Sequence, residues 1–279
     1  MRSVTAVADD IDTGLFGPHS VTWRVHLEPV LYVGGLRALI LQALHPWVML
    51  GTYQNSALFD PAKAFARFVR TAEFVGIRTF GTTSEVEAAA GRVRRIHAKL
   101  RGHDPVTGRV FRLDDPQGLL WVHCGEIDSY VDVAVRAGIL NDADADRYIA
   151  ESARAAEVVG AADAPRSRAE MKAYFDEIRP RLRLTDEAIT GTTNLMTARM
   201  PAPVAVKLTQ PPIAALGFAS MPRWARRMYG SPGLPTTDLS TTLALKALRA
   251  TLTRIPGPPE PPHMQRARRL MVEAGTLPS

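Results

Sequence analysis

Residues 84–102, SEVEAAAGRVRRIHAKLRG, predict a long amphipathic helix, and a helix of this kind sets the fold class of the chain. Ser84 and Glu87 form the pattern of a capping box, which marks a helix start. Gly102 is typical of a helix end, because glycine readily adopts the left-handed conformation that closes a last turn. We therefore expect one continuous helix between these signals.

This helix carries the candidate ligand of the chain. Arg94, His97 and Arg101 are spaced i, i+3 and i+7, so we expect the three side chains on one face. A neutral imidazole can bind iron, and two guanidinium groups suit two carboxylates, which is the combination that haem presents. The same run is also typical of a solvated basic face, and a lone histidine on a helix is usually not a ligand. These residues alone leave both interpretations open.

The segments on either side repeat the helical pattern. Helices are expected from Pro29 to about His45-Pro46, from Asp60-Pro61 onward, and from Asp115-Pro116 to Gly138. Further caps are expected at Asn141, Ser167 and Thr185, and helical periodicity returns over 237–255. The prolines of 201–235 predict short broken pieces, and Arg109–Arg112 predicts a short strand. The sequence therefore predicts an all-α fold of about eight to ten helices.

The chain is expected to form one domain. Residues 28–255 would be the all-α domain, preceded by an irregular segment, 1–27, and followed by a proline-rich linker and short helix, 256–279. The net charge of +6 is spread among acidic residues, without the basic and aromatic interleaving of a nucleic-acid interface, so we expect no nucleic-acid partner. An acidic ligand or an anionic membrane surface explains the charge equally well.

The cysteine content and the hydropathy of the sequence exclude several further classes of protein and of metal site. The single cysteine, Cys124, rules out an intrachain disulfide and a four-cysteine metal site. The first residues lack the apolar core of a signal peptide, and no uncharged apolar stretch has the length of a membrane span. We therefore expect a cytoplasmic protein, with peripheral membrane contact and a homo-oligomer left open.

A second motif, Arg67-Phe-Val-Arg70-Thr71, lies on the helix expected before the His97 helix. Arg67 and Thr71 are spaced i, i+4 and share a face. The short link between the two helices makes them expected antiparallel neighbours, so Arg67 and Thr71 could face the same cleft as His97. A surface stripe with a threonine against the core is the plainer interpretation of this motif.

The order of several motifs resembles a known family. The matching pieces are Gly35-Leu-Arg37 with Gln42–Pro46, Arg67–Thr71 with Phe80-Gly81, Val93–Ala98 with Gly102, and Asp115-Pro116 with Leu120–His123. In this order they resemble the domain shared by the rubber oxygenases (latex clearing proteins) and the fungal ER-bound oxygenase of mycophenolic acid biosynthesis. The resemblance is strong over residues 35–128.

The resemblance implies a globin-like fold with a pocket for haem b between helices. His97 matches the proximal histidine that binds the iron, and Arg94 and Arg101 match the flanking arginines that suit the propionates. Arg67 and Thr71 match the distal Arg-x-x-Lys-Thr motif, but this chain has Arg70 where that motif has lysine.

The substitution at position 70 changes what the resemblance implies. Arginine does not deprotonate in proteins, so Arg70 cannot bind the iron and we expect an open or water-bound sixth position. Arg67 or Arg70 would then donate hydrogen bonds to bound dioxygen or peroxide. Without the lysine, and without a secretion signal, rubber itself is not the expected substrate.

His123, in Trp121-Val-His-Cys-Gly125, is the other candidate cofactor-binding residue. It would line the pocket or act as a base near it, although a hydrogen-bonded core histidine is the more common arrangement. The leading hypothesis is a haem-b oxygenase that inserts dioxygen into an unsaturated apolar, isoprenoid-like substrate. A haem protein with peroxidase-like or dehydrogenating activity, and a helical haem- or lipid-binding module without catalysis, are the alternatives.

Overall fold

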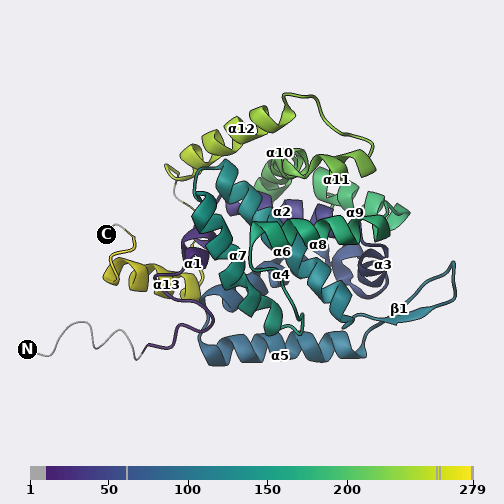
Figure 1. Ribbon diagram of the computed structural model, residues 1–279, viewed down its shortest axis with the longest axis horizontal. Coiled ribbons are helices and arrows are strands. Elements are labelled where there is room, and N and C mark those ends of the chain that lie inside the picture. Colours follow the sequence, from purple (N-terminus) through teal and green to yellow (C-terminus); the bar gives the residue numbers. More distant parts are fainter. Residues whose placement is uncertain (1–10, 61, 256, 258, 278–279) are drawn as a thin grey trace, which may run out of the picture.

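The computed structural model describes residues 11–60, 62–255, 257 and 259–277. Within them the chain is predominantly helical, which confirms the all-α prediction, although with thirteen helices rather than eight to ten. The helices are α1 (Val21–His26), α2 (Leu31–Gln42), α3 (Pro46–Asn55), α4 (Ala64–Phe80), α5 (Thr83–Lys99), α6 (Pro116–Arg136), α7 (Asp142–Glu157), α8 (Arg168–Ile178), α9 (Asp186–Thr197), α10 (Val204–Ser220), α11 (Arg223–Met228), α12 (Thr237–Leu252) and α13 (Pro262–Glu273). The 3-10 segments η3 (Ala57–Phe59) and η4 (Arg179–Arg181) and the strands β1 (Arg101–His103) and β2 (Val110–Arg112) complete the described elements. Figure 1 shows α5 along the lower edge, α12 along the upper edge and the β1–β2 hairpin projecting at one side.

The centre of the molecule is the packing of α2 against α6. Both helices bury large side chains, and the approach is close at Gly34, where a Cβ would lie 2.9 Å from the Tyr130 ring. Arg37 of α2 is 1% exposed and joins three helices. Its Nη1 donates to Asp128 Oδ2 at 2.8 Å on α6, and its Nε donates to the Ser220 carbonyl at 3.4 Å at the end of α10. A buried charge is stable only when it is paired in this way, so Arg37 fixes α10 against the central pair.

The prolines at 46 and 211–212 do not act as the sequence predicts. α2 ends at Gln42, and Pro46 instead occupies the first turn of α3, where its missing N–H costs nothing. Pro211 and Pro212 lie inside α10 rather than between broken pieces. α10 continues through them, and tertiary contacts hold it on either side of the two prolines: the Gln210 amide donates to the Leu195 carbonyl at 2.8 Å, and Gly217 lies against the backbone of α2.

No single helix of the described residues is long and apolar enough to cross a bilayer. Only α2 and α3 taken together have the required composition, and the two are bent by 103° at the break between them.

The boundaries of α4 and α5 also differ from the prediction. Pro61 lies outside the described residues, and α4 begins at Ala64 after Lys63. The capping box of α5 is formed two residues earlier than expected: Thr82 Oγ1 accepts from the Glu85 N–H, and Glu85 Oε2 accepts from the Thr82 N–H at 2.7 Å. Asp115, Asn141, Ser167 and Thr185 are N-caps as predicted.

The end of α5 corrects the central prediction of the sequence. The helix ends at Lys99, Leu100 is extended, and Arg101–His103 form β1, which pairs antiparallel with β2. Gly102 is opposite Phe111, and a Cβ on Gly102 would lie only 2.1 Å from that ring. The glycine is therefore required by the ring beneath it in a strand, and it does not close a helix. Arg101 is not on the helix of Arg94 and His97.

The N-terminal segment is more ordered than expected, because residues 21–26 form α1 with Ser20 as its N-cap. Residues 1–10 of the predicted irregular segment lie outside the described residues. Trp23 is fully buried and its Nε1 donates to the Thr79 carbonyl of α4 at 2.7 Å. Trp23, Phe16 and Phe80 form a second cluster with Ala267 and Met271 of α13, which lies beside α1 in Figure 1.

Candidate functional site

One side of α4 carries Arg67, Thr71, Phe74 and Arg78 at i, i+4, i+7 and i+11, so these side chains form a continuous row. Arg67 Nη1 donates to Thr71 Oγ1, and Thr71 Oγ1 donates to the Arg67 carbonyl at 3.0 Å. The predicted pairing of Arg67 and Thr71 on one face is therefore present. Arg70 lies off this row and is exposed.

His97 lies in the last turn of α5 and is the centre of the candidate site. Its Nδ1 is buried and has no hydrogen-bond partner among the described residues. Burial lowers the pKa of His97 below its usual value, and the nearby Arg67 guanidinium lowers it further, while Asp114 opposes the shift. His97 is therefore a neutral imidazole at neutral pH, with Arg67 close enough for its charge to act on it.

Arg94 and Arg101 do not flank His97 on a single helical face. Arg94 is exposed and donates from Nη1 to the Val158 carbonyl at the end of α7. Arg101, on β1, folds back and donates from Nη1 to the carbonyls of Ala98 at 2.7 Å and Leu100 at 2.8 Å. Arg101 thus satisfies the free carbonyls at the end of α5 rather than extending the helix.

His123 is buried on α6, with 3% of its surface exposed. Neither ring nitrogen has a hydrogen-bond partner among the described residues. Burial and the Arg78 charge lower the pKa of His123 to about 3, so the ring is neutral. A histidine with two unsatisfied nitrogens is not the hydrogen-bonded core residue that is more common, because such a residue would satisfy at least one of them.

The structure adds an ion pair that sequence reasoning missed. Arg78 Nη2 lies 2.6 Å from Glu126 Oε1 and Arg78 Nη1 lies 3.2 Å from Glu126 Oε2, which joins α4 to α6. The two side chains are 6% and 12% exposed. Burial alone would lower the pKa of Arg78, but Glu126 reverses the shift and raises it. Arg78 follows Thr71 by seven residues, and Glu126 follows His123 by three. This helical spacing from two candidate residues is the only indication in the sequence that Arg78 and Glu126 belong near them.

The lowered pKa of His123 predicts a loss of stability in acid. The unfolded chain binds a proton near pH 6.5 and the folded chain only near pH 3, so stability is fully present above pH 6.5 and falls below it. At pH 5 the folded state should lose about 2 kcal/mol relative to pH 7.5 through this group. Urea unfolding at both pH values should show the loss in the wild type and a smaller one in His123→Leu. His103→Leu, at an exposed histidine, is the control, and an unchanged pH dependence in His123→Leu would contradict the assignment.

The candidate site is not a set of clustered metal ligands. Within the described part of the chain, no group of three or more His, Cys, Asp or Glu side chains is placed to hold a metal ion. Burial raises the pKa of the Cys124 thiol, so it stays protonated and is not a thiolate ligand.

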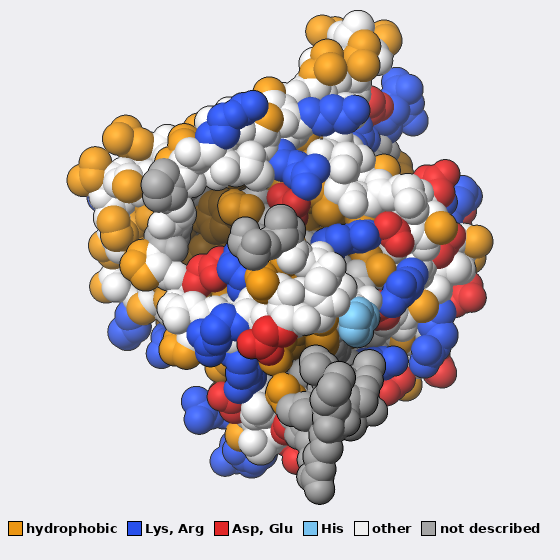
Figure 2. All heavy atoms as spheres, turned by 90° about the vertical axis from the view of Figure 1, so that its left-hand side faces the viewer, with side chains coloured by type: hydrophobic (Ala, Val, Ile, Leu, Met, Phe, Trp, Pro, Cys, Tyr) orange, Lys and Arg blue, Asp and Glu red, His pale blue; other side chains and the backbone are white. Residues whose placement is uncertain are grey.

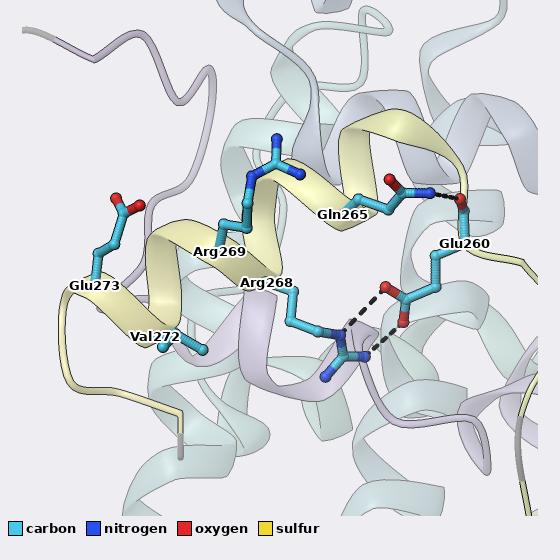
Figure 3. Close-up of a pocket in the computed structure, with 6 residues that line it drawn as sticks. All are labelled: Glu260, Gln265, Arg268, Arg269, Val272 and Glu273. Carbon is cyan, nitrogen blue, oxygen red and sulfur yellow. Dashed lines mark hydrogen bonds and ion pairs between the residues drawn. The ribbon is translucent and has the colours of Figure 1, made fainter. Parts of the chain in front are cut away.

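Two cavities open elsewhere on the surface. One of about 390 Å³ lies along α13, where Arg268 Nη2 is already paired with Glu260 Oε1 at 2.6 Å and Gln265 donates to the Glu260 carbonyl (Figure 3). The other, of about 230 Å³, lies between α1 and α7. Neither cavity is lined by His97, His123 or the arginines around His97.

Comparison with known proteins places this arrangement in a family. No curated protein and no solved structure matches the chain. The family described as "ER-bound oxygenase mpaB/B'/Rubber oxygenase, catalytic domain" matches residues 23–254, which include α4, α5, α6 and every candidate residue named above. The chain therefore belongs to the family of ER-bound oxygenase mpaB/B'/rubber oxygenase catalytic domains.

Proposed function

We propose that the protein is a haem-b-dependent oxygenase that uses dioxygen on an unsaturated, apolar, isoprenoid-like substrate. Membership of the oxygenase family supports an oxidoreductase of this class. The observation that carries the haem proposal is the neutral, half-buried His97, whose Nδ1 has no partner and whose ring lies close to a guanidinium.

The arginines around His97 fit an anionic cofactor. Among the described residues, none of them forms an ion pair with a carboxylate: Arg67 donates to a hydroxyl, and Arg94 and Arg101 donate to backbone carbonyls. Two other arginines close to these helices are paired with carboxylates: Arg78 with Glu126 and Arg112 with Asp114. Guanidinium groups without a carboxylate partner are suited to the two propionates of haem b, and the neutral imidazole is suited to its iron. The residues present therefore fit this group.

Individual residues would have different roles in this function. Haem b, when bound, supplies an iron that activates dioxygen. His97 would hold the iron through its imidazole, and Arg94 and Arg101 would bind the propionates. Arg67 would supply a positive charge and N–H donors, which would stabilise negative charge that develops on oxygen. Arg70 is exposed, and an arginine side chain has no acceptor atom with which to bind the metal.

His123 lies near Arg78, eleven residues along α4 from Arg67, and would hold or move a proton there. Its ring is neutral, and one nitrogen carries a hydrogen while the other can accept one. Neither nitrogen has a hydrogen-bond partner among the described residues, so both retain their capacity to hold or accept a proton. The Arg78–Glu126 ion pair on the neighbouring turn holds α4 and α6 together at this point.

The absorption spectrum of protein produced with an ample haem supply tests the proposal. We expect a Soret band, and we expect dioxygen consumption with at least one member of a panel of unsaturated terpenoids. Purified protein without a Soret band would refute haem binding. Turnover with hydrogen peroxide but none with dioxygen would replace the oxygenase by a peroxidase-like activity.

A further inference from the structure

The positive charge of the chain is concentrated in one region. Between Glu187 and Glu260 the sequence has eight Lys and Arg residues and a single acidic residue, Asp238. This stretch alone carries +7, whereas the whole chain carries +6. Asp238 is itself neutralised, because its Oδ1 lies 3.1 Å from Arg226 Nη2. Arg226 is buried, and Arg249 Nη2 lies 2.5 Å from Glu28 Oε1, so these two cations add little to the surface charge. The other six cations are exposed, and the surface formed by the described residues of this stretch is therefore basic; they are Arg199, Lys207, Arg223, Arg227, Lys246 and Arg254.

The same region exposes apolar side chains. Six large hydrophobic residues within it have between 56% and 73% of their surface exposed. They are Val204 and Leu208 on α10, Leu239 and Leu243 on α12, and Leu234 and Ile255 in the segments that flank α12. We call these six residues, with the exposed Lys207, Arg227, Lys246 and Arg254, the α10–α12 face.

On α12 the buried side chains and the exposed apolar side chains lie on different sides of the helix. Its inner side buries Thr241 and Leu245 against the rest of the molecule. Its outer side presents Leu239, Leu243 and Lys246 at i, i+4 and i+7, so an apolar stripe with a basic margin points to solvent. Figure 2 shows hydrophobic side chains projecting at the upper margin of the molecule, the level at which Figure 1 places α12, with Lys and Arg side chains beside them.

We propose that the α10–α12 face lies on an anionic lipid bilayer. Apolar side chains of this size gain free energy by entering the boundary between headgroups and acyl chains, and the surrounding cations are attracted to anionic headgroups. A second copy of the chain would not fit this face as well, because a two-fold contact would bring two surfaces of the same strong positive charge together.

Vesicle co-sedimentation tests this proposal with the full chain and needs neither haem nor turnover. Vesicles of phosphatidylcholine with phosphatidylserine should bind the protein, and vesicles of phosphatidylcholine alone should bind it much more weakly. A basic residue near an anionic surface contributes roughly fivefold in affinity, so Lys246→Glu, which changes the charge by two units, should weaken binding at least fivefold. Leu243→Glu should weaken binding to a similar or greater extent.

Val106→Glu is the matched control, because Val106 is 90% exposed but lies in the β1–β2 hairpin, outside the α10–α12 face. It should bind vesicles as the wild type does. All variants should keep the wild-type circular dichroism and melting temperature, since every substituted side chain is exposed.

Two outcomes would overturn the proposal. Wild-type binding that is equal for neutral and anionic vesicles, or absent from both, would show that the charge does not select a bilayer. Light scattering that shows a wild-type dimer which Leu243→Glu dissociates, together with no vesicle binding, would assign the α10–α12 face to a second copy of the chain.

Discussion

Replacing His97 by alanine should abolish the Soret band of protein reconstituted with haem b. His97 is a neutral imidazole that lies near the Arg67 guanidinium, and Arg67 has no carboxylate partner among the described residues. Outer partners of metal ligands are typically worth about 10–100-fold in affinity, so loss of the ligand itself should weaken haem binding by at least ~100-fold. Haem titration followed by absorbance measures the effect.

A rescue experiment separates ligation from folding. His97→Gly leaves space for free imidazole, and added imidazole should restore a Soret band if His97 acts only by binding the iron. Arg95→Ala, at an exposed position on the other side of α5, should bind haem as the wild type does. A Soret band of wild-type intensity in His97→Ala would show that another residue binds the iron, or that haem binds without this ligand.

Removing one partner of the buried ion pair should destabilise the fold strongly. Glu126→Gln leaves the Arg78 guanidinium charged and unpaired at a site that is 6% exposed. Breaking a buried pair in this way typically costs about 3–5 kcal/mol, because the remaining charge has lost its carboxylate partner. Urea unfolding at pH 7.5 gives the change in the free energy of unfolding.

A double variant and a surface control complete this test. Arg78→Met with Glu126→Leu removes both charges, so it should recover most of the stability that either single variant loses. Arg112→Ala breaks the exposed pair with Asp114 and should cost less than about 1 kcal/mol. A cost of that small size for Glu126→Gln would mean that water reaches Arg78 and that the pair does not hold α4 to α6.

The sequence was sufficient for the helical class and for most helix starts, because caps are local. Asp115, Asn141, Ser167 and Thr185 each accept a hydrogen bond from a backbone N–H two or three residues later. The capping box of α5 shows the limit of this signal. Thr82 and Glu85 match the same pattern as Ser84 and Glu87, and only the turn after Gly81 decides between them.

The sequence-based predictions are wrong where a contact with a residue far away in the sequence determines the local backbone conformation. Gly102 resembles a helix stop in sequence, but Phe111 nine residues later determines its place in a strand. Pro211 and Pro212 resemble helix breakers, yet contacts of α10 with α2 and α9 hold the helix together. The α1 helix is six residues long, too short for hydrophobic periodicity to be visible.

The candidate site was predictable in its individual residues more than in its arrangement. Arg67, Thr71 and His97 lie in neighbouring positions as expected, whereas Arg101 belongs to a strand and Arg70 is exposed. The sequence did not predict the buried ion pair of Arg78 and Glu126, because an arginine and a glutamate on helices are ordinarily solvated. Only the pairing of α4 with α6 reveals that both are buried.

The cluster that joins α1, α4 and α13 ties together parts of the chain that the ribosome makes at very different times. Thr276 donates to the carbonyl of Pro18, 258 positions earlier in the sequence. At about 5–20 residues per second, translation of this interval takes roughly 10–50 s. Throughout that interval the apolar side chains of Trp23 and Phe80 lack their contact with Ala267 and Met271. A nascent chain should therefore present these aromatic residues to a chaperone until α13 emerges.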